Sequence, residues 1–437
     1  MTNSIIYPTL DVNGTLELPS SKPHIQRCLL IAFFNTCDTE ITNMTWCTET
    51  LLLLDNLVIL GLKIKGKNIN SIILQGVSPE QITKNAEVNA EGSGFIFRAM
   101  VAIAALTDSI NIKCNASLYS RDSVLDNDYL SYLGVSVTKS DCEFKFSTTR
   151  AAVTSNKISI NKSSQFLSMA MILCVHLPHY EIEVESNNMG EGYIEITEKI
   201  LCQFGYQCNK KGNIYYINKC HSDSVVQILI PTDFTSLGYM MSVLSVMKND
   251  SSIQVNNYVA GNTRNDFFLK QLFKELGVEQ RIDNGILSLE NNKRNISKYS
   301  INSSLHELPS LATLIISCSV FTHRTVDINR ISHVNNHKCQ RIFVINENLR
   351  LLGLDSRFNF DKSGRFDGLH IKSNLELTGN TRLKSYNDHR VCAGNIVLSL
   401  GCNQPNIVED VDTLADGFPA FLETLTKIGI HSKPILN

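Results

Sequence analysis

The sequence predicts an α/β protein built from six copies of one unit of about 72 residues. Three observations lead to this prediction: regularly spaced glycines, an amphipathic segment before each of them, and a strongly apolar segment earlier in each unit. Neighbouring glycines lie 71 to 76 residues apart, which is more regular than chance placement would give. They are Gly61, Gly134, Gly205, Gly277, Gly353 and Gly429.

The amphipathic segments predict helices that end at these glycines. Each runs into an apolar residue and then the glycine, as in NDYLSYLGVSV. A glycine just past a helix adopts the left-handed conformation that ends the helix, and the short runs after it, such as LKI and VSV, predict strands. The six segments are residues 51–64, 127–137, 196–208, 267–280, 343–356 and 421–430.

The earlier segments of each unit predict buried helices, because they are apolar nearly all round. One unit is therefore a buried helix, a strand, an amphipathic helix and one or more further strands, with helices inside and sheets outside. The buried segments are residues 25–35, 94–106, 164–177, 236–247, 309–321 and 389–400.

Composition limits the classes of function. A chain of 437 residues suggests two or three domains, and a formal charge of −2 gives no overall attraction to nucleic acid, so any anion site must be local. The N-terminus has no basic region followed by an apolar stretch, and no run of about 18 apolar residues occurs, so we expect a soluble cytoplasmic protein without membrane contact. The 13 scattered cysteines, without a CxxC pair, predict buried free thiols and no metal site.

A set of motifs gives this chain a resemblance to a known family. The stretches LELPSSKPHIQRCLLIAFF, GSGFIFRAM, SSQFLSMAMILC, QRIFVINENLRLLGL and SYNDHRVCAGN are similar, in order and spacing, to those of 5-enolpyruvylshikimate-3-phosphate (EPSP) synthase. The resemblance covers nearly the whole chain and implies a two-domain inside-out α/β barrel with three βαβαββ units in each domain. It implies one domain at residues 20–230 and another at 1–19 plus 231–437, closing on substrate.

The resemblance also implies a reaction. That family transfers the carboxyvinyl group of phosphoenolpyruvate to the 5-hydroxyl of shikimate 3-phosphate and releases phosphate, without a metal or another cofactor. Such chemistry needs cations around phosphates and carboxylates, a base for the hydroxyl and an acid for the methylene carbon. We therefore expect small anionic substrates as the ligands, and a monomer.

Two cations at the first buried helix match the acceptor side of that family's site. By resemblance Lys22 would lie between both substrates, and Arg27 would take the acceptor's carboxylate. For an isolated lysine or arginine, an ordinary surface charge is the commoner interpretation. The surrounding motif reverses that preference.

The helix at SSQF predicts a phosphate site. Ser163, Ser164 and Gln165 open it, and paired hydroxyls over unpaired backbone N–H groups bind phosphate, although they also form ordinary N-caps. By resemblance Tyr193 would line the ring of shikimate, with a half-buried structural tyrosine as the alternative.

The phosphoenolpyruvate side looks preserved. A pocket of arginines suits a phosphate and a carboxylate. The residues that match family positions there are Gly94, Arg121, Arg341, Asp388, His389 and Arg390.

Both proton-transferring carboxylates of the family are missing. Where the family has a lysine followed by a glutamate, this chain has His337 and Lys338, which reverses the local charge. The family's basic aspartate falls on Ser310 in ungapped register, and a small shift would put His306 or Glu307 there. Further departures from the family lie at Pro23, Phe95, Gly190, His333 and Asp416.

Several functions therefore stay open. The first is an enolpyruvyl transferase of specialised metabolism with an altered cyclic acceptor, in which His337, His306 or Glu307 replaces the missing groups. A related hypothesis is an enzyme that uses the same anion pocket to eliminate a group, or to release phosphate, from a shikimate-like substrate. The others are a non-catalytic homologue that binds a phosphorylated metabolite or partner, and the ordinary activity of aromatic amino acid biosynthesis with relocated catalytic groups. Metal binding by His333 and His337 is disfavoured, because the family has a strand and loop there.

Overall fold

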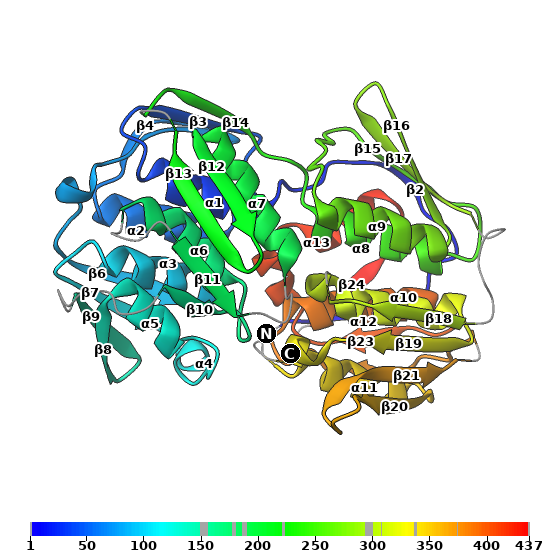
Figure 1. Cartoon of the computed structure of the whole chain (residues 1–437). Helices are drawn as coiled ribbons and strands as arrows, with labels where there is room; N and C mark the ends of the chain where they lie inside the picture. The colour runs from blue at the N-terminus through cyan, green and yellow to red at the C-terminus, as the bar shows by residue number, and fades with distance from the viewer. Residues whose placement is uncertain are drawn as a thin grey trace. The chain divides into compact units, whose positions relative to one another are not determined.

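The computed structural model describes residues 2–148, 156–176, 181–185, 190–220, 223–292, 300–306, 308–335, 339–373 and 375–435. The chain divides into two compact units (Figure 1). One comprises residues 20–231 and is called the 20–231 unit. The other comprises residues 1–19 and 232–437 and is called the 232–437 unit.

Within the described residues the strands form six four-stranded sheets that share one topology. An example is β6 (Asn85–Glu91), β7 (Ser109–Cys114), β9 (Glu143–Thr148) and β8 (Val135–Ser140), which lie in that spatial order. The first pair is parallel, and the other two pairs are antiparallel. The same order is found in β10 (Lys157–Ser159), β11 (Glu181–Glu185), β13 (Ile214–Lys219) and β12 (Tyr206–Lys211), and in β18 (Ser300–Ser304), β19 (Thr325–Asn329), β21 (Phe366–Lys372) and β20 (Asp355–Phe360).

The other three sheets are each completed by a strand from a distant part of the sequence. β14 (Val226–Leu229) joins β3 (Asp38–Thr42), β5 (Ser71–Gln75) and β4 (Lys63–Lys67). β2 (Asn13–Leu16) joins β15 (Ser252–Val255), β17 (Ile286–Asn291) and β16 (Val278–Asp283). β1 (Asn3–Ile6) lies between β23 (Asn406–Val408) and β24 (Ser432–Ile435), with β22 (Arg382–Leu383) beyond β23. The boundaries of the repeated sequence units therefore do not coincide with the boundaries of the sheets.

The inner helices confirm the prediction of buried helices. All 13 residues of α8 (Phe234–Val246) are buried, and it packs with α10 (Ala312–Thr322) and α12 (His389–Gly401). In the 20–231 unit α3 (Gly94–Ala104) packs on α6 (Gln165–Leu173) and on its own sheet, and α1 (Lys22–Ala32) is likewise buried along nine of its eleven residues. Each unit thus has helices inside and sheets outside, as predicted.

The outer helices confirm the role of the six glycines. These helices are α2 (Thr48–Ile59), α5 (Asn127–Leu133), α7 (Glu191–Gln203), α9 (Arg264–Glu275), α11 (Arg341–Leu351) and α13 (Phe421–Lys427). Every one of the six glycines that follow them has a positive φ, between 64° and 123°. Since side chains disfavour that conformation, glycine ends each helix and lets the next strand begin.

The 13 cysteines are free thiols, and five of them are buried. The expectation of buried thiols is wrong for Cys202 and Cys220, which are exposed. Among the residues that the structure describes, no helix has the length and apolar character needed to cross a membrane.

Candidate functional site

Lys22 opens α1 and lies beside the start of α2. Ser21 is the extended N-cap residue of α1, and the proline in the first turn favours the helix start. The Nζ atom of Lys22 lies 3.0 Å from Oε2 of Glu49, and both side chains are partly exposed. An ion pair of this kind holds the ammonium in place but contributes little free energy, so it does not prevent Lys22 from meeting a ligand.

Arg27 lies one turn further along α1 and is buried, with 2% of its surface exposed. Its Nε donates to Oγ1 of Thr197 (2.7 Å), and its two terminal nitrogens donate to the carbonyl of Pro23 (3.0 Å) and to Oγ of Ser168 (3.2 Å). Burial lowers the pKa of Arg27 to about 10, so the side chain remains charged at neutral pH. No carboxylate among the described residues pairs with it, and the guanidinium has more N–H groups than these three bonds use.

The ring of Phe95 covers the guanidinium of Arg27, with 5.4 Å from the guanidinium carbon to the ring centroid. Phe95 is the second residue of α3, so this cation–π contact joins the middle of α1 to the N-terminal end of α3. Phe95 is one of the sequence's departures from the family. Its ring therefore covers one side of the Arg27 guanidinium.

Arg98, also on α3, is a second buried cation that sequence reasoning missed. It is 6% exposed, and it donates to the carbonyl of Gly94 (2.9 Å), to Oε1 of Gln165 (2.7 Å) and to the carbonyl of Ser123. Burial lowers the pKa of Arg98 to about 10, and repulsion from Arg121 acts in the same direction. The signal was available, because Arg98 is the lone charge in the apolar run GFIFRAMVAIAAL.

Ser163, Ser164 and Gln165 lie at the start of α6 as predicted. The hydroxyl of Ser163 accepts a hydrogen bond from the backbone N–H of Gln165 (3.2 Å), whereas Ser164, the N-cap residue, makes no capping bond with its side chain. The Ser164 hydroxyl thus remains near the first N–H groups of the helix, an arrangement suited to an anion.

Gly190 brings the start of α7 against Ser164. Its φ is +69°, and a Cβ there would lie 2.5 Å from Oγ of Ser164 and 3.9 Å from Cδ2 of Tyr193. Glycine is therefore required at this position both by conformation and by contact. Tyr193 itself, predicted to line the acceptor ring, lies on the first turn of α7 close to these groups, and its carbonyl accepts a bond from Thr197.

Arg121 follows the short helix α4 (Ala116–Tyr119) and donates to the carbonyl of Gly92 (3.3 Å) and to Oγ of Ser117 (3.4 Å). A Cβ on Gly94 would lie 2.7 Å from Arg98 and 3.8 Å from Arg121. The starts of α3 and α6 and two guanidinium groups therefore converge in the 20–231 unit. Helix N-termini with buried cations form an environment that favours anions.

In the 232–437 unit, Arg341 and Asp388 form a buried ion pair. Nε of Arg341 lies 2.8 Å from Oδ2 of Asp388, and the Asp388 side chain is fully buried. Its other oxygen caps α12 by accepting from the backbone N–H groups of Arg390 (2.9 Å) and Val391 (3.3 Å). Burial alone would raise the pKa of Asp388, but the Arg341 charge and these hydrogen bonds hold it below its ordinary value.

His389 and Arg390, the next two residues of the NDHR motif, lie in different surroundings. Arg390 donates to the phenol oxygen of Tyr239 on α8 (3.1 Å) and also lies over its ring. His389 is buried against Gly417, where a Cβ would lie 2.5 Å from the imidazole ring. The predicted residues Arg341, Asp388, His389 and Arg390 are therefore close together at the starts of α11 and α12.

The segment expected to carry acid and base chemistry is described only in part. His337, Lys338 and Glu307 lie outside the described residues. Ser310 lies in a short 3-10 helix, and its hydroxyl is buried without a hydrogen-bond partner. The rings of His306 and His333 are 6.1 Å apart, and burial, with smaller effects of His306 and Arg330, lowers the pKa of His333 to about 4. His333 is thus neutral at pH 7. Within the described ranges no three His, Cys, Asp or Glu side chains are grouped to hold a metal ion.

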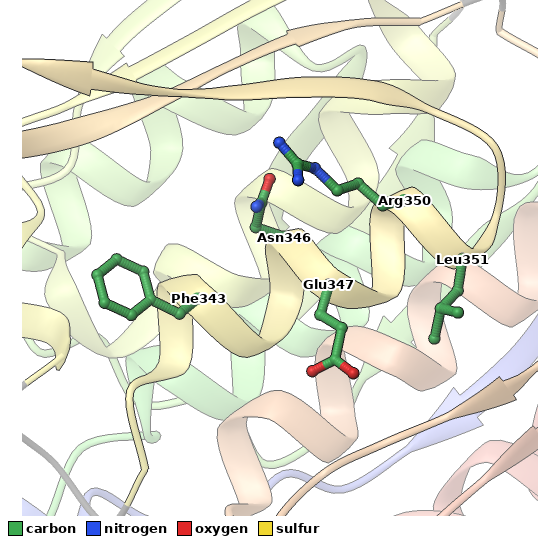
Figure 2. A pocket seen from close by; sticks show the side chains of 5 residues that line it. All are labelled: Phe343, Asn346, Glu347, Arg350 and Leu351. Atoms are coloured by element: carbon green, nitrogen blue, oxygen red, sulfur yellow. The ribbon is translucent and has the colours of Figure 1, made fainter.

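A separate surface depression lies along α11 (Figure 2). It is lined by Phe343, Asn346, Glu347, Arg350 and Leu351, and Lys384 pairs with Glu347 at 2.8 Å. None of the residues predicted from the sequence lines it, so it is distinct from the clusters described above.

Solved structures identify the fold. The EPSP synthase of Acinetobacter baumannii superposes with a TM-score of 0.77 over 100% of both chains at 16% identity. The enolpyruvyl transferase NikO from Streptomyces tendae superposes with a TM-score of 0.70, covering 99% of this chain and 98% of that one at 12% identity. The chain therefore has the enolpyruvyl transferase fold, the inside-out α/β barrel that the sequence predicts.

Sequence comparison identifies the family. The family model "EPSP synthase (3-phosphoshikimate 1-carboxyvinyltransferase)" matches residues 6–425. Curated relatives named 3-phosphoshikimate 1-carboxyvinyltransferase include those of Methanocaldococcus jannaschii, 24% identical over 98% of both chains, and Aeropyrum pernix, 23% identical over 99% of this chain and 96% of the relative. The chain belongs to the EPSP synthase family, and it is related to transferases of the shikimate pathway.

Proposed function

We propose that the protein is an enolpyruvyl transferase that moves the carboxyvinyl group of phosphoenolpyruvate onto a hydroxyl of an anionic cyclic acceptor, either shikimate 3-phosphate or an analogue. The observation that carries this proposal is the environment of Arg27. It is a buried guanidinium whose described partners are neutral oxygens, and it contacts α3, α6 and α7 through Phe95, Ser168 and Thr197. A buried cation without a partner carboxylate is costly unless an anion compensates it, so the arrangement favours an anionic ligand.

The candidate residues divide between the two ligands. Lys22, Arg27, Tyr193 and the start of α6 would bind the acceptor, with Ser163, Ser164 and Gln165 around its phosphate. Gly94, Arg121, Arg341 and the residues Asp388, His389 and Arg390 would bind phosphoenolpyruvate. We propose that residues 20–230 and residues 1–19 with 231–437 act as two domains, each of which carries some of these residues.

Proton transfer in this protein would differ from that of the family. Lys338 stands where the family has a glutamate, and an ammonium cannot act as the same acid–base pair. Ser310 stands where the family has an aspartate, and a hydroxyl is a far weaker base than a carboxylate. We therefore propose that either the acceptor or the groups that move protons have changed, with His337, His306 and Glu307 as candidates.

Phosphate release from phosphoenolpyruvate tests the proposal. Purified protein is incubated with phosphoenolpyruvate and a panel of cyclic hydroxy acids, with and without a 3-phosphate, and inorganic phosphate is followed. Lys22→Ala and Arg121→Ala should each lower turnover by at least about a hundredfold, because charge-assisted contacts to an anion are lost. Lys113→Ala and Arg357→Ala remove exposed charges and should leave turnover unchanged.

Two results would contradict the proposal. Unchanged turnover in both Lys22→Ala and Arg121→Ala would remove the proposed site from the reaction. Absence of turnover with every acceptor, while a phosphorylated acid still binds, would indicate a non-catalytic binding protein instead.

A further inference from the structure

Arg98 contacts three segments that carry candidate binding residues, although the sequence motifs assign it no contact with a ligand. Its acceptors are the carbonyl of Gly94, the carbonyl of Ser123 and Oε1 of Gln165. They belong to the start of α3, the loop that holds Arg121, and the start of α6. One buried side chain therefore fixes these segments relative to one another.

Further contacts fix the guanidinium itself. Its central carbon lies 4.7 Å from the ring centroid of Phe166, the second residue of α6. Gly94 leaves room for it, because a Cβ there would lie 2.7 Å from Nη1 of Arg98. Its Nε is buried and has no hydrogen-bond partner among the residues that the structure describes.

The contact with Gln165 determines the orientation of an amide. A guanidinium is only a donor, so the atom of Gln165 that faces Arg98 must be the carbonyl oxygen. The NH₂ group of Gln165 is then directed away from Arg98 and remains a donor at the start of α6. Without Arg98, the Gln165 side chain could adopt its other rotamers as well as the flipped amide, so the NH₂ group would face the ligand only a small fraction of the time.

We propose that Arg98 is a positioning residue that acts through Gln165, holding the glutamine amide so that its N–H groups donate to the phosphate of the acceptor. Arg98 itself does not touch the ligand. The inference rests on the proposed function, because it assumes that the start of α6 binds a phosphate group.

A double-mutant cycle on binding tests this inference. Shikimate 3-phosphate is titrated by calorimetry into the wild-type protein, Arg98→Met, Gln165→Leu and the double variant. Each single substitution should weaken binding by about tenfold or more, since each removes the oriented donor. The double variant should bind within about twofold of the weaker single variant, because both substitutions remove the same interaction.

Two further variants separate positioning from a general effect on folding. Gln165→Glu keeps an acceptor for Arg98 but lacks the NH₂ group and adds a negative charge, so it should bind at least as weakly as Gln165→Leu. Arg264→Met removes an arginine that also lies over a phenylalanine ring, Phe268, and should leave binding unchanged. If Arg98→Met does not fold, Arg98→Lys replaces it in the cycle, and binding should again be weakened non-additively with Gln165→Leu.

The outcomes distinguish this inference from the proposed function. Two results would overturn the positioning role and leave the proposed function intact. In the first, the losses of affinity in the two single variants multiply in the double variant. In the second, an Arg98 variant binds as tightly as wild type while Gln165→Leu binds more weakly. If wild-type protein binds neither shikimate 3-phosphate nor phosphoenolpyruvate, the proposed function fails, and the inference fails with it.

Discussion

Arg27 and Arg98 show what a buried charge reveals at the scale of single residues. Both lie on helices that are otherwise buried and largely apolar, and both are surrounded by neutral oxygens and a phenylalanine ring. Sequence motifs indicated Arg27 but not Arg98, because Arg98 has its effect through Gln165, which lies 67 residues away in the chain. Contacts between distant segments are not visible in a local pattern.

Residues proposed to touch ligand are easier to predict from sequence than the residues that support them. Lys22, Arg27, Arg121 and the serines of the SSQF motif were named from residue type and motif alone. The partners of Arg27, which are Thr197, Ser168 and Phe95, depend on how α1, α3, α6 and α7 pack, so no local sequence pattern reveals these contacts. In the same way, the pairing of Arg341 with Asp388 joins the starts of two helices that are far apart in sequence.

The buried pair of Arg341 and Asp388 gives a prediction about stability and pH. Asp388→Asn keeps a helix-capping side chain but leaves Arg341 without its charge partner, so we expect a loss of about 3–5 kcal/mol at pH 7. The folded-state pKa of Asp388 lies below its ordinary value of 3.8, so its contribution is fully present above that value and is lost as pH falls through the folded pKa. The difference in the free energy of unfolding between variant and wild type should thus stay constant from about pH 7 to 5 and become smaller only below about pH 4.

Urea unfolding of both proteins across this pH range measures the effect. Asp355→Asn is the matched control, since its contact with Arg357 is exposed, and we expect a change under about 0.5 kcal/mol. A difference that already narrows between about pH 7 and 5 would show that Asp388 is not the source of the stabilisation.

At the scale of elements, helix positions followed from local pattern, whereas strand pairing did not. All six amphipathic segments and all six apolar segments form helices, and the glycines end the amphipathic ones. Strands β1, β2 and β14 pair with strands about 180 to more than 400 residues away, as in the contacts of Ser4 with Val408 and of Thr39 with Val226. Such pairing depends on the path of the whole chain, so no periodicity reveals it.

Edge strands explain another part of the sequence. In the 20–231 unit the strands β4, β8 and β12 lie at sheet edges and carry lysines, including Lys63, Lys139 and Lys210. Charged side chains on an edge oppose pairing with another chain. These lysines are therefore accounted for by the fold, and they are no sign of a nucleic-acid surface.

The helix-ending glycines give a prediction at this scale. Gly353 ends α11 with φ of +85°, and a Cβ there would meet nothing within 4 Å. Gly353→Ala should thus destabilise the protein by about 1 kcal/mol through backbone conformation alone, which corresponds to a lower Tm by roughly 2–4 °C for a unit of this size. Differential scanning calorimetry measures the shift.

Gly66→Ala is the control for this prediction. Gly66 lies on β4 without a positive φ, and a Cβ there would make an ordinary contact of 3.7 Å with Ile73. Its effect should stay within about 0.5 kcal/mol. Equal effects of the two substitutions would mean that the left-handed conformation is not what the repeat glycines provide.

At the scale of the whole molecule, the chain keeps the architecture of its family, and we propose that it changes groups that the family uses for proton transfer. The fold extends over both units, and the family match covers residues 6–425. In the proposed site the cationic residues and helix starts persist, whereas Lys338 and Ser310 would take the places of two carboxylates. Fold and family can thus be predicted from the sequence. The identity of the acceptor depends on the chemistry of the site, which the fold alone does not determine.

Phosphorus-31 NMR of the protein with phosphoenolpyruvate and shikimate 3-phosphate tests the central claim most directly. We predict that the phosphoenolpyruvate resonance is consumed, and that inorganic phosphate appears together with a carboxyvinyl ether of a cyclic acceptor. With shikimate 3-phosphate this result would show that other groups replace the two missing carboxylates, and with an analogue it would identify a changed acceptor. An unchanged phosphoenolpyruvate resonance with every acceptor tried would contradict the assignment of this protein as an enolpyruvyl transferase.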